Sequence, residues 1–289
     1  MDREIFPGYR ANHQRLVCID SDGCMFDTME IKHKECFCPA TIQVWGLQPI
    51  AKYVREAWEF CNLYSKDRGR SRFHELILIF DLLAERDEVK QYRFTLPDIT
   101  SFRNWVKTAP VLNNAGLKEH PDDPVLARAL AWSLESNRRI EEMVHGIPPF
   151  PNARESVQRL SGEADIAIVS ATPREALERE WSEHGLLAHV HQLCAQEDGS
   201  KKECIGALKG YYPAGNVLMI GDALGDLEAA KANGSLFYPI RPNREIDSWR
   251  IFREEAMQRF LEGSYAGAYE AELIENFQSG LSDVPPWKR

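Results

Sequence analysis

Four short apolar runs recur along the chain, each bounded by turn residues: residues 16–19, 166–169, 217–220 and 236–240. Residues 189–194 are a further predicted strand. Continuous apolar runs of this length are typical of strands that are buried on both faces, as in a parallel sheet. Segments with helical periodicity separate the later runs. This alternation of strands and helices predicts a doubly wound, Rossmann-like α/β sheet.

The starts of two helices in the second half of the chain are also predicted by their sequence. Thr172 with Pro173 and Glu175 predicts a capping box that has proline at the first helical position. Ser200 and Glu203 predict a second capping box. Each helix then follows a predicted strand, as the doubly wound topology requires.

The segment between the first two predicted strands differs from the rest of the chain. It contains three stretches with helical periodicity, at residues 51–63, 73–83 and 127–143. It has no comparable series of apolar runs, and prolines near its end mark the return to the α/β pattern. The sequence therefore predicts an α/β core formed by residues 1–29 and 147–289, with a mainly helical domain at 30–146 inserted into it. Within the core, residues 244–278 predict amphipathic helices.

Composition narrows the kind of partner that we expect. The 289 residues have a formal net charge of -9, which argues against a general nucleic-acid or anionic membrane surface. No apolar segment approaches the length of about 18 residues that a membrane span requires, and the N-terminus lacks the apolar stretch of a secretory signal. The seven scattered cysteines do not form a disulfide framework. We therefore expect a cytoplasmic protein with reduced thiols.

Polar side chains that suit phosphate chemistry follow the predicted strands: Asp20 and Asp22, Ser170, and Asp222 with Asp226. Ligands of open α/β sheets bind at the carboxyl ends of the strands, so these side chains are expected at one rim. Clustered carboxylates repel one another unless a cation such as Mg²⁺ lies between them. Lys201 and Lys202 begin a helix, where positive charge is unfavourable, and this predicts a nearby anion.

The order of these motifs resembles that of the haloacid dehalogenase-like (HAD) hydrolase superfamily. The run Asp-Ser-Asp-Gly-Cys-Met-Phe-Asp-Thr at 20–28 is similar to its first motif, and Ser170 after Ile-Ala-Ile-Val to its second. A lysine at 201 or 202 and Gly-Asp-Ala-Leu-Gly-Asp at 221–226 are similar to its third and fourth. The resemblance covers about residues 12–30 and 146–240. It also implies that the inserted helical region is a type 1 cap.

The resemblance implies a role for each motif residue. Asp20 would be the nucleophile that forms an aspartyl-phosphate, and Asp22 the general acid and then the general base. Ser170 would donate a hydrogen bond to a phosphoryl oxygen, and the lysine would neutralise charge. Asp222 would bind Mg²⁺ together with Asp20 and the backbone carbonyl of Asp22.

Three further assignments complete the expected site. Lys201 is preferred to Lys202 as the motif lysine, because family members commonly carry it four residues before the first apolar position of the helix. Asp226 would support the metal shell or orient the lysine. Gly23 would permit the tight turn after the first strand.

A basic turn in the inserted region provides a candidate for substrate binding. Residues 65–72 lie between two predicted helices and include Arg70 and Arg72. A mobile basic tip of this kind could close over the site and contact an anionic substrate. A solvated surface turn is the alternative.

The expected function is a Mg²⁺-dependent phosphomonoesterase that acts on a small phosphorylated metabolite. A phosphomutase or a phosphonate hydrolase would use the same core, and the second of these needs a lysine in the cap. Halide removal is disfavoured, because that branch lacks an aspartate at the position of Asp22. A receiver-like phosphoacceptor or a binding protein is the alternative outside enzymes, and a receiver would accept phosphate without catalytic turnover.

Overall fold

The computed structural model describes residues 6–288, which divide into two compact units. The first unit contains the described residues up to Thr28 and the segment Gly146–Leu281. The second contains Met29–His145 and the C-terminal residues from Ser282 onward. Each unit has a hydrophobic core of its own.

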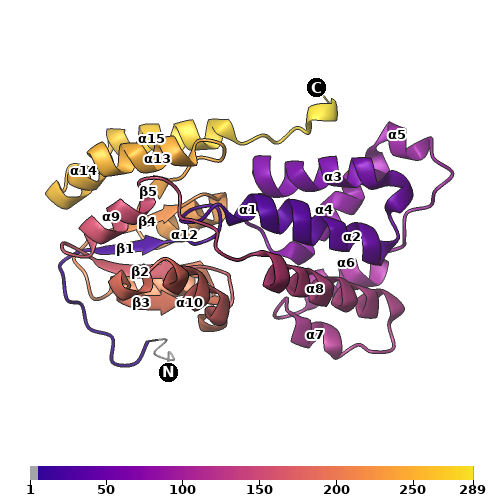
Figure 1. Cartoon of the computed structure of the whole chain (residues 1–289), viewed down its shortest axis with the longest axis horizontal. Coiled ribbons are helices and arrows are strands. Elements are labelled where there is room, and N and C mark those ends of the chain that lie inside the picture. Colours follow the sequence, from indigo (N-terminus) through magenta and orange to yellow (C-terminus); the bar gives the residue numbers. More distant parts are fainter. Residues whose placement is uncertain (1–5, 289) are drawn as a thin grey trace. The chain divides into compact units, whose positions relative to one another are not determined.

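A five-stranded parallel sheet, with strand order β3-β2-β1-β4-β5, forms the centre of the first unit (Figure 1). The strands are β1 (Leu16–Ile19), β2 (Asp165–Val169), β3 (Gln192–Cys194), β4 (Val217–Gly221) and β5 (Leu236–Pro239). Ile19 of β1 is in register with Ile168 of β2 and Ile220 of β4, so the carboxyl ends of these three strands lie together. The predicted doubly wound sheet is confirmed.

Helices cover both faces of this sheet. They are α9 (Ala153–Leu160), α10 (Arg174–Glu183), α11 (Lys201–Lys209), α12 (Leu224–Ala232), α13 (Glu245–Ile251), α14 (Met257–Glu262) and α15 (Ala268–Gly280), and a π-helical turn, η6 (Phe252–Ala256), joins α13 to α14. Successive side chains of a strand point to opposite faces. Val17 and Ile19 therefore pack with α9, α10, α13 and α14, whereas Leu16 and Cys18 pack with α11, α12 and α15.

The two predicted helix starts had different outcomes. Ser200 caps α11 as predicted: its hydroxyl accepts from the amide of Glu203 at 3.3 Å, and the Glu203 carboxylate accepts from the Ser200 amide at 2.8 Å. The capping role predicted for Thr172 is wrong. Pro173 is the residue that precedes the first turn of α10, and the amide of Arg174 in that turn donates to the carboxylate of Glu197 at 3.1 Å. The hydroxyl of Thr172 instead donates a hydrogen bond to the carboxylate of Asp22.

The second unit is helical in the part of the chain that the structure describes. Its helices are α1 (Thr28–Ile31, starting at the last residue of the first unit), α2 (Cys38–Trp45), α3 (Ala51–Glu59), α4 (Arg72–Glu85), α5 (Asp87–Lys90), α6 (Thr100–Thr108), α7 (Asn114–Lys118) and α8 (Pro124–Met143), with π-helical turns η1 (Lys32–Phe37) and η3 (Phe60–Tyr64). Aromatic side chains such as Trp58, Phe102 and Trp132 fill the interior. No described helix is both long and apolar enough to cross a membrane.

The last residues of the chain pack in the helical unit. The amide of Ser282 donates to the carbonyl of Tyr64 at 3.2 Å. The guanidinium of Arg86 lies 4.5 Å from the ring centre of Tyr53 and 4.5 Å from that of Trp287. The contact of Arg86 with Trp287 thus helps to hold the C-terminal segment within the second unit.

Candidate active site

Three buried carboxylates meet at the carboxyl ends of β1 and β4. Asp20 follows β1, Asp222 follows β4, and Asp226 lies in the first turn of α12. One oxygen of each carboxylate lies within 4.8 Å of the others. The side chains come together because β1 and β4 are paired in register, so residues that follow the two strands are neighbours.

Lys201 provides a positive charge beside these carboxylates. Its Nζ lies 2.8 Å from Oδ2 of Asp20 and 2.5 Å from Oδ1 of Asp226. Burial alone would lower the pKa of Lys201, but the two carboxylates hold it above its usual value, so the side chain carries its proton. Lys202 is exposed. The geometry therefore brings Lys201, and not Lys202, to the carboxylates.

Asp226 is held in place by the backbone as well as by the lysine. Its Oδ2 accepts hydrogen bonds from the amides of Asp222 and Ala223 at 3.1 and 3.0 Å. This approach requires a glycine at position 221, because a Cβ on Gly221 would lie 2.4 Å from the Asp226 carboxylate. Both oxygens of Asp226 are thus engaged, and the arrangement orients Lys201 toward Asp20.

Two hydroxyl groups hold the carboxylate of Asp22. Thr28 donates to its Oδ1 at 2.5 Å, and Thr172 donates to its Oδ2 at 2.8 Å. Thr28 begins α1 and Thr172 lies in the loop after β2, so two separate segments fix one side chain. No role in the site was predicted for either threonine from the sequence. The available signals were the place of Thr28 at the end of the motif run at 20–28 and the position of Thr172 two residues after Ser170.

The turn after β1 and the end of β2 complete the site. Gly23 has φ of +71°, a conformation that favours glycine, and its amide donates to the carbonyl of Phe26 at 2.9 Å. Ser170 is buried, and its amide donates to the carbonyl of Cys194 at 3.1 Å. Its Oγ accepts a longer hydrogen bond, 3.4 Å, from the amide of Thr172. Ser170 directly follows β2, and both its amide and its hydroxyl therefore have backbone partners.

The electrostatics of the cluster suit a divalent cation. Burial raises the pKa of Asp20 above its usual value, Lys201 opposes this effect, and Asp226 adds to it. The single charge of Lys201 does not balance three carboxylates. Hard oxygen ligands of this kind are those that Mg²⁺ takes in proteins, and the remaining ligands are commonly phosphate oxygens and water. The donor set therefore fits Mg²⁺.

The two arginines of the predicted substrate-binding turn lie in the second unit. Arg70 is 63% exposed and forms an ion pair of 2.9 Å with Asp67. Arg72 donates to Oδ1 of Asn137 at 2.6 Å and lies 4.7 Å from the ring centre of Phe37. Arg72 is thus engaged within its own unit. Substrate binding by these arginines stays a prediction.

Comparisons with known proteins agree with the motif order. Residues 14–234 match a family model described as haloacid dehalogenase-like hydrolase. A search of curated proteins finds no match.

The solved structures that match the chain share little sequence with it. A haloacid dehalogenase-like hydrolase from Bacteroides fragilis is 15% identical, with 82% of this chain and 93% of that one covered and a TM-score of 0.49. A structure named a predicted phosphoglycolate phosphatase, from Haemophilus somnus, is 14% identical, with coverage of 78% and 84% and a TM-score of 0.47. A hydrolase from Pseudomonas syringae is 15% identical, with coverage of 82% and 89% and a TM-score of 0.47. At these identities the structures indicate no substrate for this chain.

Proposed function

The chain belongs to the haloacid dehalogenase-like hydrolases, and from this premise we propose that it is a phosphomonoesterase that acts on a small phosphorylated metabolite. One observation supports this function above the others. The nucleophile candidate Asp20 lies 2.8 Å from the ammonium group of Lys201, while Asp22, two residues further on, has both carboxylate oxygens held by hydroxyl groups.

In the first step, a carboxylate oxygen of Asp20 attacks phosphorus. The bond from phosphorus to the leaving oxygen breaks, and Asp22 donates a proton to that oxygen. Lys201 offsets the negative charge that gathers on Asp20 and on the phosphoryl group. Ser170 donates a hydrogen bond from its hydroxyl to a phosphoryl oxygen.

In the second step, the aspartyl-phosphate is hydrolysed. Asp22, now ionised, takes a proton from a water molecule, and the oxygen of that water attacks phosphorus. The bond between phosphorus and Asp20 breaks, which releases inorganic phosphate and restores both aspartates. Thr28 and Thr172 keep the Asp22 carboxylate in one orientation through both proton transfers.

Asp20, Asp222 and the backbone carbonyl of Asp22 would hold the Mg²⁺ ion. When bound, this ion would neutralise charge on the phosphoryl oxygens. Asp226 would act on the site through Lys201, because its own oxygens accept from Lys201 and from two backbone amides.

The helical unit would serve as a type 1 cap that excludes water and selects the substrate. Arg70 and Arg72 are its candidate contacts with the anionic part of the substrate. Substitution of Arg70 is the more specific test of substrate binding, because Arg72 also packs on Phe37 and its loss would affect the structure of the helical unit.

The function is tested by the release of inorganic phosphate from para-nitrophenyl phosphate in the presence of Mg²⁺, followed by a panel of phosphorylated sugars, nucleotides and small acids. The expected result is multiple turnovers for the wild type and for Asp122→Asn, an exposed control, with a loss of several orders of magnitude for Asp20→Asn. Stoichiometric phosphorylation without turnover would indicate a receiver-like protein. An isomerised phosphate ester as the product would indicate a mutase, and either result would overturn the proposed function.

A further inference from the structure

A tryptophan from the C-terminal helices holds the turn that follows β1. Trp249 lies in α13 and is fully buried. Its indole N–H donates a hydrogen bond of 2.7 Å to the backbone carbonyl of Cys24. Cys24 is two residues beyond Asp22, in the turn between β1 and α1. A residue 225 positions away in sequence therefore contacts the turn that carries both proposed catalytic aspartates.

Two other carbonyls of this turn accept hydrogen bonds from the backbone. The Ser21 carbonyl accepts from the amides of Met25 and Phe26 at 2.9 and 3.1 Å, and the Met25 carbonyl accepts from the amide of Phe150 at 3.0 Å. The carbonyl of Cys24 instead accepts from the indole. A buried carbonyl without a partner is unfavourable, so removal of the indole N–H would destabilise this conformation of the turn.

A second tryptophan holds the same turn from another helix. Trp181 of α10 is fully buried, and its indole N–H donates to Oγ of Ser21 at 3.1 Å. Its ring also packs edge-on against Phe26, with 5.7 Å between ring centres. Ser21 lies between Asp20 and Asp22 in the sequence. The turn is thus held at Ser21 by α10 and at Cys24 by α13.

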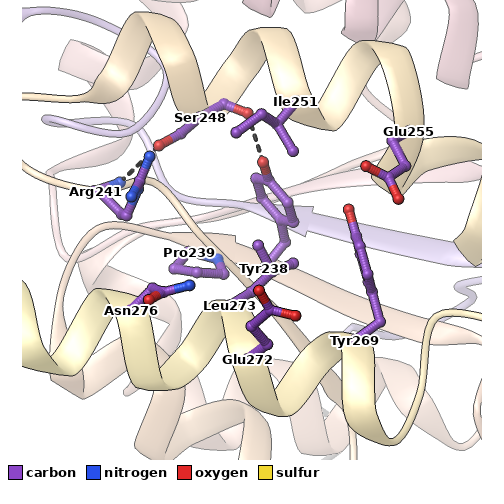
Figure 2. Close-up of a pocket in the computed structure, with 10 residues that line it drawn as sticks. All are labelled: Tyr238, Pro239, Arg241, Ser248, Ile251, Glu255, Tyr269, Glu272, Leu273 and Asn276. Atoms are coloured by element: carbon purple, nitrogen blue, oxygen red, sulfur yellow. Dashed lines mark hydrogen bonds between the residues drawn. The ribbon is translucent and has the colours of Figure 1, made fainter.

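The turn of α13 that carries Trp249 is itself fixed to the end of β5. The hydroxyl of Tyr238 donates to the carbonyl of Ser248 at 2.5 Å, and the amide of Arg241 donates to Oγ of Ser248 at 3.1 Å (Figure 2). Next to these bonds, a cavity of about 250 Å³ is lined by residues of α13 and by residues of α15 such as Tyr269 (Figure 2). Ser248 directly precedes Trp249, so these bonds add to the core packing that holds the tryptophan.

We propose that Trp249 is a positioning residue for the reaction: through the Cys24 carbonyl, it fixes the turn that carries Asp20 and Asp22, and Trp181 supports it through Ser21. This inference rests on the proposed phosphatase function. A nucleophile and an acid–base group act efficiently only in a narrow range of positions, and a displacement of about 1 Å can lower the rate about 100-fold. The C-terminal helices thus contribute to catalysis as well as to the hydrophobic core.

The test compares two substitutions that each remove one buried hydrogen bond. Trp249→Phe keeps an aromatic ring and removes the N–H. Tyr265→Phe is the matched control, because the Tyr265 hydroxyl, also fully buried and in the C-terminal region, donates to the carbonyl of Phe237 at the same distance, 2.7 Å. The two readouts are hydrogen–deuterium exchange of the amides at 20–26 and the values of kcat and KM for para-nitrophenyl phosphate.

In Trp249→Phe, exchange at 20–26 is expected to become at least tenfold faster than in the control. The value of kcat is expected to fall about tenfold, with little change in KM, because the turn carries the reacting groups and not the substrate contacts. A merely structural role would lower the Tm of both variants and leave exchange at 20–26 and kcat alike in the two. If either the exchange rate at 20–26 or the kcat of Trp249→Phe equalled that of Tyr265→Phe, the inference would be overturned.

The exchange measurement keeps this inference separate from the proposed function. If the wild type has no phosphatase turnover, the proposed function fails, and the exchange rates alone decide whether Trp249 orders the turn. If Trp249→Phe does not fold, Trp181→Phe carries the same test through Ser21. If the exchange rate at 20–26 and the kcat of Trp181→Phe equalled those of Tyr265→Phe, the inference would likewise be overturned.

Discussion

The hydroxyl of Thr172 donates a hydrogen bond of 2.8 Å to Oδ2 of Asp22, a residue 150 positions earlier in the chain. The two residues meet because β1 and β2 are adjacent parallel strands and both residues follow the ends of these strands. Thr28 holds the other oxygen of the same carboxylate. Two hydroxyl groups from separate segments thus fix the orientation of Asp22.

Removal of this hydroxyl is expected to lower the rate. Thr172→Val keeps the shape of the side chain but leaves Oδ2 of Asp22 without this donor. A hydrogen bond to a charged group is worth about 1.5–3 kcal/mol, so kcat for para-nitrophenyl phosphate should fall about tenfold or more. Thr108→Val, which removes an exposed hydroxyl bonded to the Asn104 carbonyl, is the control. An unchanged kcat in Thr172→Val would show that the hydroxyl does not position Asp22.

The two neighbouring lysines provide a matched pair of variants. Lys201→Met should lower kcat about 100-fold or more, because it removes the charge beside Asp20 and Asp226 that offsets the developing negative charge. Lys202→Met changes an exposed side chain and should have little effect. Steady-state kinetics of both variants check this assignment. A larger loss of kcat in Lys202→Met than in Lys201→Met would identify Lys202 as the motif lysine instead.

The metal site is tested through Asp222. Asp222→Asn removes one negative charge from the cluster of three carboxylates, so the Mg²⁺ concentration for half-maximal activity should increase. Part of the lost activity should return at high Mg²⁺, and removal of metal with EDTA should abolish turnover of the wild type. If the Mg²⁺ dependence of Asp222→Asn matched that of the wild type, Asp222 would not be a ligand.

Glu75 in α4 predicts a pH dependence of stability. Burial raises the pKa of Glu75 from its usual value of 4.5 to about 8. The negative charge of Asp67 also raises this pKa, and the positive charge of Arg70 lowers it. Among the described residues, neither carboxylate oxygen of Glu75 has a hydrogen-bond partner. The unfolded chain ionises this group at lower pH than the folded chain does. The contribution of Glu75 to stability is therefore full below about pH 4 and is lost as the pH rises to about 8.

Substitution of Glu75 should remove this pH dependence. The free energy of unfolding of the wild type, relative to that of Glu75→Gln, should decrease between pH 5 and pH 8 by about 1 kcal/mol or more, as measured by urea denaturation. Glu141→Gln, an exposed substitution in the same unit, should follow the wild type. Parallel curves for the wild type and Glu75→Gln would contradict the raised pKa.

Local patterns were sufficient to predict the sheet, because each apolar run is a strand buried on both faces and its period is visible in the sequence. The same patterns place Asp20 and Asp222 after strands that are paired in the sheet, and the structure brings these two carboxylates together. Local patterns failed at Thr172, because a threonine before a proline has the same local signal whether its hydroxyl caps a helix or bonds a distant carboxylate.

The contacts of the C-terminal region could not be predicted for a related reason. Trp249 lies in a segment whose periodicity predicts only an amphipathic helix, and its acceptor on Cys24 is fixed by tertiary packing. The packing of Trp287 with Arg86 in the helical unit also joins residues that are distant in sequence. Neither contact has a signal within one helix or one turn.

The proposed reaction requires that Asp20 becomes covalently phosphorylated during turnover. The most direct measurement is to mix the enzyme with Mg²⁺ and a phosphorylated substrate, trap the intermediate with sodium borohydride, and sequence the peptides by mass spectrometry. Because borohydride reduces an aspartyl-phosphate to homoserine, we expect homoserine at position 20 in the wild type and none in a sample without substrate. Turnover with an unmodified Asp20, or with the modification at another residue, would contradict the proposed reaction.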